Sequence, residues 1–369
     1  MKRTMKRISS LLLVLAMASA MFLLPGCGGN SGGQASGGGQ SSGGDTDAPA
    51  SGAPSSSLTP ADDGQPVYTL KAGNTCTMDH PYNTGLLALQ ELLYERSDGH
   101  ILLDIYPSGQ LGNEGDLLEG LQMGTVDIAV TASAPVVNFS NALAVLDLPY
   151  LFESKQHAFN VLDGEIGNQF WNDLASVGIK GLAFFDNGFM YVHTNSGFVN
   201  KPDDMKGLKL RTMENSLHQS FVNSCGATAT PMAMGEVFTA LQNSTVQGSV
   251  NSTITIYTSK WYTVAGSITH TDHIYATAPM TMSQLTFDKL PAEYQDLLLE
   301  CAKEARDIER QAVADMEASA EDDMISQGCE ISYDADIDAY KAIVYDQVWP
   351  QFVGKTIDAG LVEQIQALA

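Results

Sequence analysis

Hydrophobic positions follow two periods that alternate along the chain after residue 65. Short apolar runs at 67–73, 101–106 and 126–131 are typical of buried strands. Between them, leucines recur at helical spacing over 82–96 and 115–123, which indicates two helices with one apolar face each. Strands that alternate with helices in this way predict a mostly parallel sheet with helices on both faces.

The same alternation continues toward the C-terminus. The further predicted elements are strands at 181–186, 190–194 and 208–213, and helices at 216–225, 336–352 and 359–368. The stretch 291–327 has no internal Pro or Gly and begins with Pro291, a residue suited to the first turn of a helix. It predicts one helix that is longer than a typical helix of a single domain. We expect this helix to span two lobes of the fold.

The N-terminus has the pattern of a lipoprotein signal. Basic residues precede an apolar run over 11–24, which is too short to cross a membrane as a helix. The run ends in Leu-Leu-Pro-Gly-Cys at 23–27, which resembles a bacterial lipobox. We therefore expect residues 1–26 to be a cleaved signal peptide and Cys27 to carry a lipid. An ordinary signal peptide with an incidental cysteine is the alternative.

The composition restricts the partners and the covalent chemistry. Residues 27–65 begin with that cysteine and continue as a Gly- and Ser-rich flexible linker. The whole chain has a formal net charge of −24, and a surface of this charge repels phosphate backbones, so we expect no nucleic acid partner. The remaining cysteines have no zinc-type spacing, and their pairing as disulfides stays open; they are Cys76, Cys225, Cys301 and Cys329.

Seven ordered segments carry a family resemblance. They read Tyr-Pro-Ser-Gly-Gln-Leu-Gly at 106–112, Gly-Thr-Val-Asp-Ile-Ala at 124–129, Leu-Asp-Leu-Pro-Tyr-Leu-Phe at 146–152, Asp-Asn-Gly-Phe at 186–189, Met-Lys-Gly-Leu-Lys-Leu-Arg at 205–211, Gly-Ala-Thr-Ala-Thr-Pro-Met at 226–232 and Glu-Val-Phe-Thr-Ala-Leu-Gln at 236–242. In this order and spacing they resemble the DctP-type solute-binding components of TRAP transporters, over about 68–327.

The resemblance implies an α/β, two-lobed fold like that of periplasmic binding proteins, with a hinge, a ligand cleft between the lobes and a long helix bracing both. On this basis lobe I comprises 66–188 and 277–316, and lobe II comprises 189–276 and 317–369. It further implies closure of the lobes on a small organic carboxylate and delivery of this ligand to the membrane subunits of a TRAP transporter. No cofactor, metal ion or catalytic residue is implied. The lipid anchor would hold the protein on the extracytoplasmic face of the cell membrane.

Arg211 is the first candidate for ligand binding. It ends the alternating segment Leu-Lys-Leu-Arg at 208–211 of a predicted strand, and ligands of α/β sheets bind in the crevice beyond the carboxyl ends of strands. A guanidinium matches a carboxylate with two parallel hydrogen bonds, which Lys does not provide. In the resembled family the arginine of this motif holds the ligand carboxylate. A structural salt bridge with one of the many acidic residues is the alternative.

Further candidates come from the same resemblance. Asn251 occupies the family's Asn position, and Glu114 follows the Leu-Gly turn at a position that contacts polar ligand groups in some relatives. Trp261 matches a family aromatic that can flank the cleft, although core packing is the commoner role. Met234 follows the Thr-Pro turn near the expected pocket, again with a core role as the alternative. Met190 stands where many relatives that bind acidic sugars or dicarboxylates have a second arginine.

The residue at 190 predicts the kind of ligand. A second carboxylate buried opposite a thioether would lose its hydration with no compensating charge. We therefore expect a ligand with one carboxylate, such as a 2-oxo, hydroxy or aromatic acid. An acidic ligand whose second charge meets Lys209 or Lys260 is the alternative.

Two other classes of function stay open. An exported enzyme is one, and His270 and His273 could form part of a metal site, although the sequence places no third ligand. A binding protein that feeds a sensor, or that scavenges freely, is the other.

Overall fold

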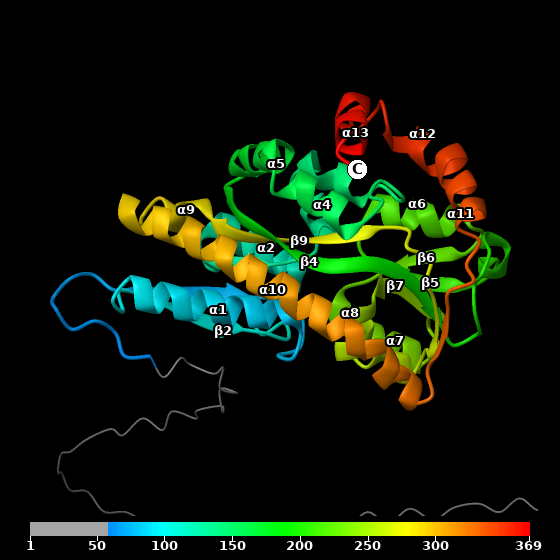
Figure 1. Ribbon diagram of the computed structural model, residues 1–369, viewed down its shortest axis with the longest axis horizontal. Helices are drawn as coiled ribbons and strands as arrows, with labels where there is room; N and C mark the ends of the chain where they lie inside the picture. Colours follow the sequence, from blue (N-terminus) through cyan, green and yellow to red (C-terminus); the bar gives the residue numbers. More distant parts are fainter. Residues whose placement is uncertain (1–57) are drawn as a thin grey trace, which may run out of the picture. The chain divides into compact units, whose positions relative to one another are not determined.

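The computed structural model describes residues 58–369, and the strands of this part form a single mixed sheet (Figure 1). The predicted signal peptide, Cys27 and most of the predicted linker lie outside the described residues. Along the sheet the order is β2-β1-β3-β9-β4-β7-β5-β6, and β8 pairs with both β4 and β10. The strands are β1 Tyr68–Gly73, β2 Ile101–Tyr106, β3 Ile128–Val130, β4 Ile179–Thr194, β5 Lys209–Thr212, β6 Thr228–Pro231, β7 Gly248–Ser252, β8 Ser267–Thr269, β9 Tyr275–Ser283 and β10 Glu330–Ser332.

β4 connects the two halves of this sheet. Its first part pairs antiparallel with β9, and its last part pairs with β7 and β8. The prediction of separate strands at 181–186 and 190–194 is therefore wrong, because the chain continues through a β-bulge between Asp186 and Phe189. Gly188, at φ +84°, allows the bend without ending the strand.

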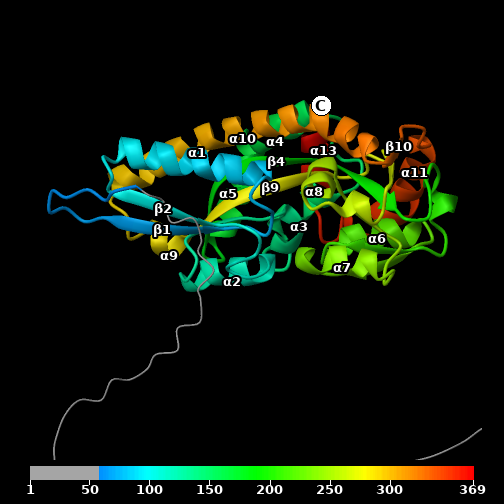
Figure 2. The ribbon, with the colours of Figure 1, turned by 90° about the horizontal axis from the view of Figure 1, so that it is seen from below.

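Helices cover both faces of the sheet (Figure 2). They are α1 Pro81–Arg96, α2 Glu114–Met123, α3 Ser133–Val136, α4 Lys155–Leu162, α5 Glu165–Ala175, α6 Ser216–Ser224, α7 Val237–Gln242, α8 Thr253–Thr258, α9 Gln284–Phe287, α10 Ala292–Ser326, α11 Ile337–Ile343, α12 Trp349–Phe352 and α13 Ala359–Gln366. Within residues 58–369, none of these helices combines the length and the apolarity that a membrane crossing requires.

Two consecutive phenylalanines of β4 show how the core is divided. Phe184 packs with residues of α2, α4 and α5 on one face, whereas Phe185 packs with residues of α1 and α10 on the other. Both rings are almost fully buried. The predicted α/β fold with helices on both faces is confirmed, but the sheet is mixed and not mostly parallel, because β4 pairs antiparallel with β7, β8 and β9.

The long helix predicted at 291–327 is also confirmed, as α10. It packs against α1 and the first part of β4, and farther along against α8 and β10, so it braces both halves of the sheet (Figure 1). The helix predicted at 336–352 is interrupted by a π-helical turn at Val344–Val348. Pro350 lies in the first turn of α12, where its missing backbone donor is tolerated.

Candidate functional site

A small cavity lies between the two halves of the sheet. The loop after β1, α1, α2 and β3 contribute one wall, β4 contributes Asn187, and the second half of the sheet contributes the opposite wall. The lining residues are Thr75, Cys76, Tyr82, Glu114, Ala132, Asn187, Arg211, Met213, Met234, Asn251 and Thr255. Its volume of about 20 Å³ holds little more than one water molecule. An organic ligand therefore requires the two halves to move apart before it enters.

Arg211, near the end of β5, is the cation of this cavity. Its side chain is almost fully buried, and its Nε and Nη2 atoms both donate to the carbonyl of Met232, at 3.1 and 2.9 Å. The Nη1 atom has no hydrogen-bond partner among residues 58–369. Over the same residues, Arg211 forms no ion pair. The alternative role of Arg211, a structural salt bridge with an acidic residue, is therefore not observed among these residues.

Burial also affects the ionisation of Arg211. Desolvation lowers the pKa of the guanidinium to about 10, and the nearby carboxylates of Glu114 and Glu214 oppose this shift. The group is still positively charged at neutral pH. A buried cation with an unpaired donor is costly, and a ligand carboxylate in the cavity would offset that cost.

Glu114 begins α2 and lies in the opposite wall. Asn113 caps this helix through a reciprocal capping box with Asp116, which fixes the first turn. The Oε1 atom of Glu114 accepts a hydrogen bond from the backbone nitrogen of Ala132 at 2.7 Å. Desolvation raises the pKa of this carboxyl, while the Ala132 N–H and the charge of Arg211 oppose the rise. The guanidinium of Arg211 and the carboxyl group of Glu114 therefore lie in opposite walls of the cavity.

Two asparagines complete the polar lining. The Oδ1 atom of Asn251 accepts from the backbone nitrogen of Ser252 at 2.9 Å. Asn187 accepts at Oδ1 from the hydroxyls of Ser252 and Thr255, at 2.9 and 3.3 Å. Since both carbonyl oxygens are engaged, the amide NH₂ groups are oriented to donate elsewhere. Asn187 belongs to a segment that resembles the family, but it is not among the predicted ligand-binding residues, and the structure adds it to the lining of the cavity.

The sulfur-containing residues divide between the cavity and the core behind it. Met234 lines the cavity, and its sulfur accepts from the Thr75 hydroxyl at 3.4 Å, which links the two walls. Met190, predicted to contact the ligand, is fully buried in an apolar cluster with Met213, Ile274 and three alanines, and is not part of the lining. Met213 lines the cavity in its place. The thioethers in the cavity lining therefore belong to Met213 and Met234 and not to Met190.

Trp261 also lies one layer behind the cavity. Its ring is buried among residues such as Ile256 and Ile268, and it stacks on His193 with centroids 5.9 Å apart. The Cζ atom of Arg211 lies 5.8 Å from the ring centroid. Trp261 therefore supports the guanidinium from behind and does not line the cavity.

The remaining polar candidates lie elsewhere. Lys209 and Lys260 are exposed and do not line the cavity, so neither meets a second ligand charge there. His270 pairs with Glu321 at 2.9 Å, and buried His273 stacks on Phe221. Within the described part of the chain, no cluster of His, Cys, Asp and Glu has the arrangement of a metal site. The four cysteines of that part are buried and free; they are Cys76, Cys225, Cys301 and Cys329.

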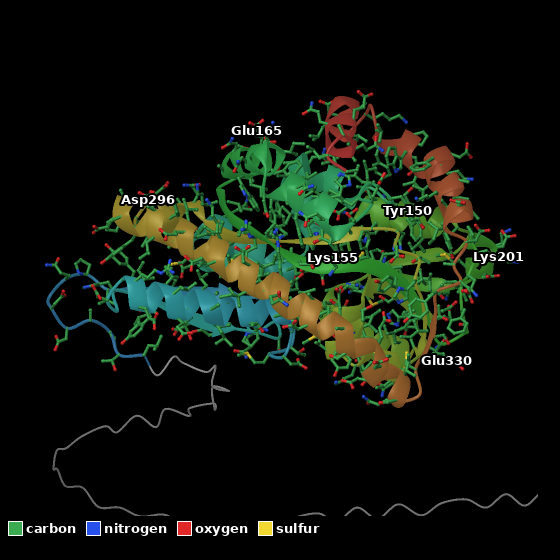
Figure 3. The ribbon with its side chains drawn as sticks, in the orientation of Figure 1. Tyr150, Lys155, Glu165, Lys201, Asp296 and Glu330 are labelled. Carbon is green, nitrogen blue, oxygen red and sulfur yellow. The ribbon has the colours of Figure 1, made fainter. Side chains whose placement is uncertain are left out.

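A larger cavity of about 610 Å³ is lined by residues that include Tyr150, which is labelled in Figure 3. Its cation, Lys341, lies with Nζ 5.7 Å from the centroid of the Tyr150 ring, and the Tyr150 hydroxyl donates to the carbonyl of Thr271 at 3.0 Å. Among the described residues that line this cavity, no buried polar atom lacks a partner. This cavity is larger, but the described residues that line it include no unpartnered buried donor. The cavity at Arg211 has such a donor and is therefore the better candidate for a ligand site.

Most of the chain matches one known protein family. Residues 72–355 match the family described as bacterial extracellular solute-binding protein, family 7, or DctP. The chain belongs to this family. Family 7 proteins are extracytoplasmic binding proteins, and the predicted resemblance is confirmed.

Three relatives of this family 7 protein have informative names. The 2,3-diketo-L-gulonate-binding periplasmic protein YiaO of Escherichia coli is 31% identical, over 78% of this chain and 88% of YiaO. The C4-dicarboxylate-binding periplasmic protein DctP of Rhodobacter capsulatus is 30% identical, over 64% of this chain and 72% of that protein. A crystal structure of a TRAP periplasmic solute-binding protein from a Polaromonas species, bound to D-erythronate, has a TM-score of 0.79 and 30% identity, and the match covers 81% of this chain and 98% of that chain.

Proposed function

We propose that this protein is the solute-binding component of a TRAP transporter and captures a small organic carboxylate at Arg211. The observation that carries the proposal is the buried guanidinium with an unpartnered Nη1 atom in the wall of a cavity. Membership of family 7 and the names of the relatives support the same class of ligand. Asn251, Glu114 and Met234 complete the contact surface, and Asn187 is added to it.

The ligand carries one carboxylate. Among the described residues that line the cavity, Arg211 is the only cation, and Glu114 repels a second anion. The relatives named above differ in this respect, since D-erythronate has one carboxylate and a C4-dicarboxylate has two. The charges of this cavity favour the first kind, because a second buried carboxylate would lose hydration without gaining a partner.

The two lobes predicted from the sequence move relative to each other when the ligand binds and leaves. Lobe I comprises 66–188 and 277–316, lobe II comprises 189–276 and 317–369, and the bulge of β4 lies at their boundary. The ligand enters when the lobes separate, and closure returns them to the arrangement described above. The membrane subunits of the transporter then receive the ligand, and a lipid on Cys27 keeps the protein at the outer face of the cell membrane.

Mass spectrometry of gently purified protein tests the proposal. Denaturing the wild-type protein should release an organic acid with one carboxylate, and Arg211→Ala purified in the same way should release none. A ligand without a carboxylate, or equal recovery from both proteins, would contradict it. Chemical conversion of the recovered acid on incubation with the protein would favour an exported enzyme. Neighbouring genes for a membrane-bound sensor, in place of transporter subunits, would favour the sensor alternative.

A further inference from the structure

Tyr82 is a second polar group of the cavity whose hydrogen bonding is incomplete. It lies in the first turn of α1, is almost fully buried and lines the cavity on the side opposite Arg211. Its hydroxyl has no hydrogen-bond partner among residues 58–369. Buried hydroxyls are normally paired, so an unpaired one in the wall of a ligand cavity points to a partner supplied by the ligand.

The position of this hydroxyl is fixed by the surrounding structure. Asn74 Nδ2 donates to Asn83 Oδ1 at 2.8 Å, and Asn83 Nδ2 donates to the carbonyl of Thr77, also at 2.8 Å, which ties the loop after β1 to α1. His80 caps α1 by accepting from the backbone nitrogen of Tyr82. Because the loop and the helix start are joined in this way, the backbone of Tyr82 is held in place beside the cavity.

The Tyr82 ring packs against other aromatic rings. Its centroid lies 4.3 Å from that of His80 and 6.4 Å from that of Phe185, and the residue belongs to the core cluster beneath α1 and α10. Burial raises the pKa of the phenol well above its usual range, so the group stays neutral and retains its proton. The cavity wall thus presents one fixed hydrogen-bond donor.

Glu114 supplies an acceptor in the same wall. Its Oε1 atom is engaged by the Ala132 N–H, which leaves Oε2 to accept from the ligand. A ligand hydroxyl suits both groups, since it accepts from the Tyr82 hydroxyl and donates to the Glu114 carboxylate. A methylene group suits neither.

We propose that Tyr82 is a specificity-determining residue that donates a hydrogen bond to a hydroxyl of the ligand, so that the protein selects hydroxylated carboxylates over aliphatic ones. This inference rests on the proposed function, because Arg211 must bind the carboxylate of the ligand while Tyr82 donates to a hydroxyl elsewhere in the same ligand. The ligand thereby bridges the two walls of the cavity.

The experiment compares two acids of equal carbon number, D-erythronate and butanoate, by calorimetric titration of the wild-type protein and Tyr82→Phe. Wild type should bind D-erythronate more tightly. Tyr82→Phe should weaken D-erythronate binding about tenfold, the loss expected for one buried hydrogen bond, and leave butanoate within about twofold. Tyr94→Phe is the matched control, because Tyr94 lies on the same helix and its hydroxyl donates to the carbonyl of Thr59. It should change neither affinity.

A second readout separates this role from a structural one. In the ligand-free protein the lobes separate and water reaches the Tyr82 hydroxyl, so Tyr82→Phe should melt within about 1 °C of wild type without ligand. A hydroxyl with a structural role would instead lower the melting temperature of Tyr82→Phe.

Three results would overturn the inference: unchanged D-erythronate affinity in Tyr82→Phe, an equal loss for both acids, or a wild-type protein that binds D-erythronate no more tightly than butanoate. The proposed function fails separately. It fails if Arg211→Ala binds carboxylates as wild type does, whatever the behaviour of Tyr82→Phe.

Discussion

Asp186 and Asn187 are consecutive residues of β4, yet their side chains serve different sites. Asn187 lines the ligand cavity, whereas Asp186 accepts hydrogen bonds from Lys155 Nζ at 2.9 Å and from the Tyr275 hydroxyl at 2.7 Å. Lys155, which is labelled in Figure 3, also pairs with Glu317 of α10. A ligand that contacts Asn187 is therefore one peptide bond away from an ion-pair network that joins β4, α4 and α10.

Lys155→Met should destabilise the protein through this network. The change leaves the buried carboxylate of Asp186 and the partly buried one of Glu317 without their cation. We expect the free energy of unfolding to fall by about 1.5–3 kcal/mol, the range for hydrogen bonds to charged groups, as measured by urea unfolding. Lys206→Met is the matched control, because Lys206 pairs with Asp203 on the surface, and such pairs contribute about 0–1 kcal/mol. Equal effects of the two changes would contradict the assignment.

Glu309 should make stability depend on pH. It is fully buried in the middle of α10; Oε2 accepts from the backbone nitrogen of Asp186, and Oε1 has no partner among residues 58–369. Desolvation raises the pKa of its carboxyl well above the usual value of 4.5. The folded chain then binds a proton that the unfolded chain releases, so the free energy of unfolding should fall as the pH rises above about 4.5.

Glu309→Gln tests this dependence because the amide keeps the size and the acceptor but does not titrate. Urea unfolding between roughly pH 5 and 8 should show a shallower decline in stability for Glu309→Gln than for wild type. Part of the decline should persist, since burial also raises the pKa of Glu114 and Glu317. Glu293→Gln, on an exposed part of the same helix, should behave as wild type. Parallel curves for all three proteins would show that Glu309 does not cause the dependence.

Apolar periodicity is sufficient for some elements of the fold. A long stretch without Pro or Gly located α10, and periodicity located α1 and β2 almost to the residue, because each has an uninterrupted apolar pattern. It failed at β4, where Asn-Gly resembles a turn but forms a bulge within a continuous strand. Periodicity reports which residues are buried locally, whereas the continuity of β4 depends on pairing with strands that come much later in the chain.

The site illustrates a related limit. Family motifs led to Arg211, Glu114, Asn251 and Met234, all of which line the cavity. They also led to Met190 and Trp261, which lie behind it, and they missed Asn187, Met213 and Tyr82. A motif places a residue on the correct strand or loop, but the direction of a side chain at the meeting point of several elements is set by packing between them.

Met213→Arg should change the ligand preference. The side chain of Met213 lines the cavity, so a guanidinium there would supply the second cation that a dicarboxylate needs. Titration with two acids of four carbons should show that succinate gains about tenfold in affinity relative to butanoate. Met190→Arg should instead destabilise the fold, because Met190 is fully buried among apolar residues and does not line the cavity, so the charge would have no ligand to pair with. An unchanged ratio of the two affinities in Met213→Arg would argue against the charge-based account of specificity.

Cys27→Ala should release the protein from the membrane. The lipobox-like sequence at 23–27 predicts that the Cys27 thiol carries the lipid. Fractionation of cells should find wild type with the membranes and Cys27→Ala in the soluble extracytoplasmic fraction. Retention of the variant with the membranes would show that the anchor lies elsewhere.

The proposed function depends on the unpartnered guanidinium of Arg211 as the group that holds the carboxylate of the ligand. Calorimetric titration with the acid that co-purifies with the wild-type protein measures how much this side chain contributes to binding. Arg211→Ala should bind this acid at least about a hundredfold more weakly, because one partner of a buried charged pair is lost, and Arg211→Lys should recover only part of the affinity. Native affinity in Arg211→Ala would contradict the account.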